Sequence, residues 1–173
     1  MFYGNLGNFL GFLAAICYLL TLLPSLIRIV VPKFFPLKLP RLLLKYRREI
    51  GVMAWIFGFL HGTFIVVEKN LNLLDLNVAK NFLQGLALIT IFTLLAVTSN
   101  DYSLKYLKQN WKKLHRITYL GLLILPWHIL DKMSPKWSIT TPITLTLILV
   151  FIFLSLIRIW IYYNHSKLRR NLK

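Results

Sequence analysis

The sequence is poor in acidic residues and in cysteine. Only 5 of its 173 residues are aspartate or glutamate, against 21 lysines and arginines, and the formal net charge is +16. The single cysteine, Cys17, cannot form an internal disulfide. The chain has no Rossmann glycine fingerprint and no P-loop, so it carries no nucleotide-binding domain of its own. Paired carboxylates and a serine-based triad are absent too, and we predict no catalytic residue.

Long apolar runs are abundant instead. Hydrophobic residues make up 57% of the chain, and each run approaches or reaches the roughly 20 residues that a membrane span needs. The runs lie at about 8–31, 50–67, 82–99, 114–130 and 142–163. The pattern predicts an all-α fold: a polytopic membrane helix bundle with five transmembrane helices, forming one domain over residues 1–173. The basic residues flank these runs, so the charge indicates a membrane protein and not a nucleic-acid partner.

The placement of the basic residues predicts the orientation of the bundle. Seventeen of them lie in three segments that five spans would bring to one side, and four lie on the other side. Basic loops stay in the cytoplasm, so we expect the N-terminus outside, the C-terminus in the cytoplasm, and cytoplasmic segments at 32–49, 101–113 and 164–173. The proline-rich, basic segment 32–49 is predicted to be an interfacial strap on anionic lipid; a docking surface for an acidic partner is the alternative.

Three histidines lie in the apolar runs, where ionisable groups usually mark a functional site. His61 is 13 residues beyond Arg48, and His128 is 15 residues beyond Lys113. At about 1.5 Å per residue, both histidines sit roughly 20 Å above the inner charged boundary. Neutral imidazole is the commonest protein ligand of haem iron, so His61 and His128 are predicted to bind one haem between their helices. As an alternative, a lone membrane histidine can hydrogen-bond a neighbouring helix.

His115 lies 13 residues before His128 and therefore roughly 20 Å lower. It cannot share a haem with His128. Trp111 and Arg116 flank it, and an aromatic ring with positive charge suits a haem propionate, a flavin phosphate or a quinol head group. A basic anchor against lipid phosphates is the competing interpretation. His165 follows the fifth span and is expected to be exposed to solvent.

Several motifs together resemble the ferric-reductase-like transmembrane domain family. They are Arg47-Arg48-Glu-Ile-Gly51 leading to Leu60-His61, then Thr98-Ser99, then Trp111-Lys-Lys-Leu-His115-Arg116, and finally His128. Their order and spacing agree over about residues 45–165. Within the family, the sequence resembles in particular the haem-binding membrane subunit of methionine sulfoxide reductase systems, the MsrQ or YedZ type.

The resemblance implies a six-helix bundle in which b-type haem is held by histidines from two helices, here His61 and His128. This chain would lack the first of the six helices. Two-haem relatives have a second histidine on each ligand helix, and this sequence has Gly51 where one would be expected. We therefore expect one haem, with a second cofactor near His115 left open. The larger reductases carry a flavin and nicotinamide domain that is absent here, so electrons would come from a separate quinol or reduced flavin.

The function predicted from the sequence is electron transfer by a membrane cytochrome b subunit. A donor on the cytoplasmic side would reduce the haem, and an acceptor outside would take the electrons. The alternative is an accessory subunit of a larger membrane complex, in which haem is structural or absent. A small transporter is disfavoured because the spans hold few polar groups and no evident inverted repeat. Expected partners are membrane lipid and a separate reductase or acceptor protein, in a bacterial plasma membrane or a thylakoid membrane.

Overall fold

The computed structural model describes residues 2–72, 75–133 and 140–171, and all regular structure within these ranges is helical. The long helices are α1 (Phe2–Val30), α3 (Arg47–Glu68), α5 (Leu83–Val97), α8 (Thr118–Met133) and α9 (Thr140–Asn171). The shorter α-helices are α2 (Lys38–Lys45), α4 (Leu76–Asn81), α6 (Asp101–Leu107) and α7 (Gln109–Leu114). Two 3₁₀ turns, η1 (Pro32–Phe34) and η2 (His115–Ile117), precede α2 and α8. The predicted all-α class is confirmed.

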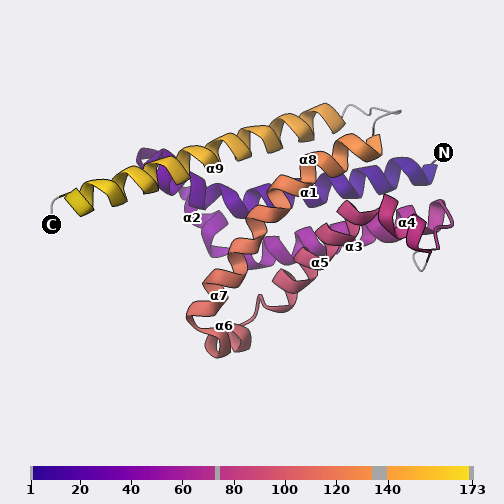
Figure 1. Ribbon diagram of the computed structural model, residues 1–173, viewed down its shortest axis with the longest axis horizontal. Coiled ribbons are helices and arrows are strands. Elements are labelled where there is room, and N and C mark those ends of the chain that lie inside the picture. The colour runs from indigo at the N-terminus through magenta and orange to yellow at the C-terminus, as the bar shows by residue number, and fades with distance from the viewer. Residues whose placement is uncertain (1, 73–74, 134–139, 172–173) are drawn as a thin grey trace.

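Helix α1 lies at the centre of the bundle (Figure 1). It packs along α3 and α9, while α5 packs against both α3 and α8. Its residues Tyr18, Leu22 and Leu26 are at most 2% exposed. The same core includes one buried residue or more from each other long helix, among them Ala54, Leu88, Leu122 and Ile148. A helix that is apolar on most faces is suited to such a central position.

Three described helical segments are long and apolar enough to cross a membrane: Leu6–Val30, Arg47–Glu68 and Thr140–Asn164. Helices α5 and α6 form a fourth candidate only if the 90° bend between them lies within one span. The predicted run 114–130 corresponds to helix α8, which has only 16 residues. It begins at Thr118 because His115–Ile117 form the separate turn η2. The described residues thus hold three or four candidate spans by length and composition, and the expected count of five stays a prediction.

The expected strap at 32–49 contains η1 and α2, and its last three residues already belong to α3. In α2, Pro40 and Leu43 are buried, while Leu39, Arg41 and Leu42 are exposed. An interfacial helix needs such a mixture of exposed apolar and basic side chains. The predicted C-terminal tail is not a separate segment, because α9 continues to Asn171 and projects beyond the other helices (Figure 1).

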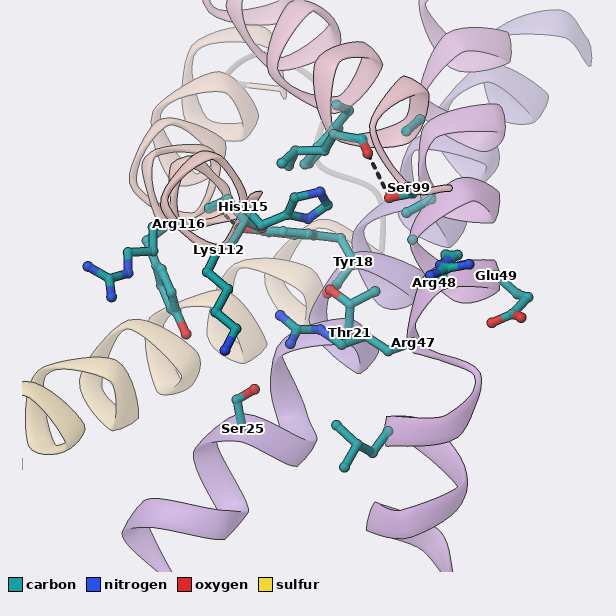
Figure 2. A pocket seen from close by; sticks show the side chains of 18 of the residues that line it. Tyr18, Thr21, Ser25, Arg47, Arg48, Glu49, Ser99, Lys112, His115 and Arg116 are labelled. Atoms are coloured by element: carbon teal, nitrogen blue, oxygen red, sulfur yellow. Dashed lines mark hydrogen bonds between the residues drawn. The ribbon is translucent and has the colours of Figure 1, made fainter. Parts of the chain in front are cut away.

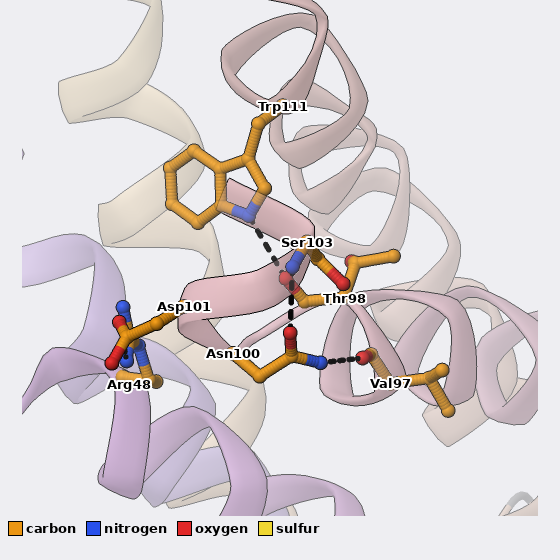
Figure 3. A network of polar contacts seen from close by, with 7 residues as sticks. All are labelled: Arg48, Val97, Thr98, Asn100, Asp101, Ser103 and Trp111. Atoms are coloured by element: carbon orange, nitrogen blue, oxygen red, sulfur yellow. Dashed lines mark hydrogen bonds and ion pairs between the residues drawn. The ribbon is translucent and has the colours of Figure 1, made fainter. Parts of the chain in front are cut away.

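The chain turns sharply after α5, and side chains hold the turn (Figure 3). The Asn100 side chain accepts a hydrogen bond from the Ser103 N–H at 2.7 Å and caps α6. The indole N–H of Trp111 donates to the Thr98 carbonyl at 2.9 Å, and Arg48 pairs with Asp101 at 2.8 Å. These contacts fasten α6 and α7 to the N-terminal end of α3 and the C-terminal end of α5.

Candidate functional site

His61 of α3 and His128 of α8 face each other. Their ring centroids are 6.4 Å apart and their planes are nearly perpendicular, at 88°. A bond from a metal to an imidazole nitrogen is about 2 Å long, and the ring centre lies roughly 1 Å further on. Two imidazoles on opposite sides of one metal therefore have centroids roughly 6 Å apart. The pair stands at the separation that two axial ligands require.

The pair fits a haem iron better than a bare metal ion. Across residues 2–72, 75–133 and 140–171, no group of three or more histidines, cysteines and carboxylates is arranged to hold a metal. Two imidazoles alone leave the coordination of an ion incomplete. A haem brings its own equatorial nitrogens and needs only axial ligands from the protein.

The orientation of His61 is fixed by α1. Its Nδ1 lies 2.7 Å from the carbonyl oxygen of Gly7. A carbonyl can only accept, so Nδ1 carries the proton and Nε2 keeps its lone pair for a metal. Hydrogen bonds of this kind to a backbone carbonyl commonly orient histidines that bind metals.

Two glycines that the sequence analysis did not single out contact the histidines. Gly11 of α1 faces the His61 ring, and Gly85 of α5 faces the His128 ring. In the sequence, each is visible only as a glycine within an apolar helix. The packing of α1 on α3 and of α5 on α8 shows that each glycine lies against a histidine.

A cavity of about 690 Å³ opens at the end of the bundle where α1, α3, α5, α7 and α8 come together (Figure 2). Six basic side chains line it, against the one carboxylate of Glu49: Lys45, Arg47, Arg48, Lys112, Arg116 and Arg158. We call this cavity, with these six side chains, the basic cavity. Its charge favours an anionic group, and its volume suits a small-molecule cofactor.

His115 and Trp111 both line the basic cavity. Their rings stack with centroids 3.9 Å apart, and His115 Nε2 lies 3.3 Å from the hydroxyl oxygen of Thr98. The Thr98 hydroxyl donates to the Leu94 carbonyl at 2.7 Å, so it accepts from His115 Nε2–H. This leaves Nδ1 as the acceptor of the neutral ring.

Helices α8 and α9 also contribute residues to the wall of the basic cavity, although these residues are distant in sequence. Arg158 of α9 donates a hydrogen bond to the Tyr119 hydroxyl of α8, and both residues line the cavity. The hydroxyl of Tyr18, from α1, donates to the Thr118 carbonyl at 2.5 Å. Arg116 lines the cavity as well and is largely exposed. The side chain of His165 lies outside the part of the chain that the structure describes.

The basic cavity and the histidine pair are one heptad apart on two helices. Ala54 and Phe92 line the cavity, and each lies seven residues from the level of the pair, at His61 on α3 and at Gly85 on α5. Seven residues of helix rise about 10 Å. Tyr18 and Phe92, whose ring centroids are 5.0 Å apart, stand on the side of the cavity that faces the pair.

Comparison with known proteins gives a family match. The family model described as ferric reductase like transmembrane component matches residues 10–126. The matched stretch begins within α1, includes His61 and His115, and ends two residues before His128. No solved structure matches the chain.

Similar curated proteins come from Brucella ovis, Brucella canis and Brucella suis. Each is named protein-methionine-sulfoxide reductase heme-binding subunit MsrQ and is 32% identical to this chain over 85 residues. That stretch covers 46% of this chain and 39% of each relative. The similarity therefore extends over less than half the length of these proteins.

Proposed function

The chain belongs to the family of ferric reductase like transmembrane components, and from this premise we propose that it is a haem-binding membrane subunit for electron transfer. It would accept electrons from a donor at its cytoplasmic face and deliver them to an acceptor on the opposite side. The separation of His61 and His128, 6.4 Å between ring centroids, is the observation that carries this proposal. The names of the Brucella relatives, which describe heme-binding subunits, support it.

His61 and His128 would be the axial ligands of one haem. When bound, the haem supplies a one-electron redox centre in a site shielded from water. The only cysteine is Cys17, so the chain has no C-x-x-C-H motif for covalent attachment, which favours b-type haem. Gly51 stands where two-haem relatives would have a further ligand. A Cβ added to Gly51 would lie 3.8 Å from the Thr21 methyl group.

The basic cavity would receive the electron donor. Its six basic side chains would face the cytoplasm, in accord with the distribution of lysine and arginine along the chain. They favour a donor that bears phosphate, such as a reduced flavin, over a neutral quinol. His115 Nδ1 can accept a proton from the donor, and Trp111 beside it offers an aromatic surface for a flat ring. The donor site and the histidine pair are about 10 Å apart along the helix axis, which is the distance the electron would cross.

The acceptor would be a separate protein on the opposite side of the membrane. The relatives are named as subunits of a protein-methionine-sulfoxide reductase, so we propose a reductase of that class as the partner. The chain itself would supply the membrane crossing and the ligands, and the partner would supply the chemistry on the substrate.

A visible absorption spectrum of the purified protein tests this function. The proposal requires a b-type spectrum that dithionite reduces and air reoxidises. A preparation that stays colourless after expression with added haem precursor, while correctly inserted in the membrane, would contradict it and support the accessory-subunit alternative.

A further inference from the structure

Glycines on two helices contact the same edge of each candidate haem ligand. A Cβ added to Gly11 would lie 3.0 Å from His61 Nδ1 and 3.2 Å from its Cε1. A Cβ added to Gly85 would lie 3.2 Å from His128 Cε1 and 3.7 Å from its Nδ1. Carbon atoms in close contact ordinarily lie about 3.5–4.0 Å apart. A methyl group at either glycine would therefore push directly on an imidazole ring.

We propose that Gly11 and Gly85 are positioning residues, which keep the imidazoles of His61 and His128 in the orientation that binds haem. The inference rests on the proposed function. Glycine has no side chain, so each position leaves room on its helix, and the edge of the imidazole ring occupies that room. With Nδ1 of His61 donating to the Gly7 carbonyl, Nε2 of the same ring keeps the lone pair that a metal would bind.

The constraint is strongest at His61, because α1 contacts this ring twice. Gly7 and Gly11 are four residues apart and lie on one face of α1. The carbonyl of Gly7 holds Nδ1 at 2.7 Å, and the missing side chain of Gly11 leaves room for that same atom. The ring cannot move away from a methyl group at position 11 without stretching the hydrogen bond to Gly7.

Glycines in membrane helices often serve only to let helices approach closely, and two glycines of α3 illustrate the difference. A Cβ at Gly58 would meet the Cβ of Ala14 at an ordinary 3.9 Å, and a Cβ at Gly62 would have no neighbour within 4 Å. At Gly11 and Gly85 the nearest atoms belong to imidazole rings instead. Gly62, which adjoins His61 in sequence, is thus a matched control for the effect of alanine on a helix near the site.

The test compares Gly11→Ala, Gly85→Ala and Gly62→Ala in the full-length chain, purified with its haem. We expect Gly11→Ala and Gly85→Ala to shift the haem midpoint potential and the low-spin electron paramagnetic resonance signal, or to lower haem content several-fold. Gly62→Ala should match the wild type in all three measurements. Wild-type potentials, signals and haem content in both Gly11→Ala and Gly85→Ala would overturn the inference.

A second experiment separates a push on the ring from a general packing defect. In His61→Gly, free imidazole added to the solution can replace the missing ligand and is not tied to α3. Gly11→Ala should then have little effect in the His61→Gly background, although it has a large effect in the wild type. An equal loss of haem in both backgrounds would assign Gly11 to helix packing and contradict the proposal. If the wild-type protein itself holds no haem, the proposed function fails, independently of the glycines.

Discussion

Trp111 and His115 stack on each other at the edge of the basic cavity, with ring centroids 3.9 Å apart. The indole N–H of Trp111 is bound to the Thr98 carbonyl, and Nε2 of His115 is bound to the Thr98 hydroxyl. One residue at the end of α5 therefore fixes both rings. This arrangement leaves His115 Nδ1 as the available acceptor and supports the proposal that His115 serves the donor, remote from the His61–His128 pair.

Replacement of His115 should separate donor oxidation from haem binding. We expect His115→Ala to retain the wild-type haem content and spectrum but to slow haem reduction by reduced flavin about tenfold or more, because a proton acceptor contributes on this scale or above it. Stopped-flow absorbance measures the rate. Lys113→Ala, an exposed basic residue outside the cavity lining, is the control. Unchanged reduction kinetics in His115→Ala would leave His115 as a lipid anchor.

Removal of one cavity charge should weaken the binding of an anionic donor. A hydrogen bond to a charged group contributes about 1.5–3 kcal/mol, so Arg47→Gln should raise the concentration of reduced flavin mononucleotide needed for half-maximal haem reduction by roughly tenfold or more. Arg41→Gln, on the exposed face of α2, should leave it unchanged. If Arg47→Gln behaves as the wild type with flavin and a neutral quinol reduces both equally, the donor is a quinol.

The orientation of the bundle can be read by cysteine labelling in a Cys17→Ala background. Lys105 in α6 and Asn77 in α4 are both exposed, and they belong to opposite sides in the predicted topology. With an impermeant thiol reagent, Lys105→Cys should react only after the cytoplasmic side is opened, and Asn77→Cys should react in intact cells. Reaction of Lys105→Cys in intact cells would show that the predicted topology is reversed or wrong.

The sequence predicted the helical class and the approximate position of each long helix, because apolar runs near the length of a span have few alternatives. It also brought His61 and His128 to one level by a count of residues along two helices. That count works because a helix rises by a constant amount per residue. It does not depend on knowing which helices are neighbours.

The features that sequence reasoning missed depend on those neighbours. Gly11 contacts His61 only because α1 packs on α3, and Arg158 bonds Tyr119 although it lies 39 residues later in the chain. The basic cavity likewise gathers charges from five segments of the chain. The periodicity of one helix reports its own apolar face and does not identify the residue that will lie against it.

Substitution of the two ligands tests the central claim most directly. His61→Ala, His128→Ala and the control His165→Ala would each be purified, and their haem content and reduced-minus-oxidised spectrum compared with those of the wild type. A six-coordinate low-spin site needs both ligands, so His61→Ala and His128→Ala should each lose most of the haem or its low-spin spectrum, and His165→Ala should retain both. A normal low-spin spectrum at full haem content in either His61→Ala or His128→Ala would contradict the account.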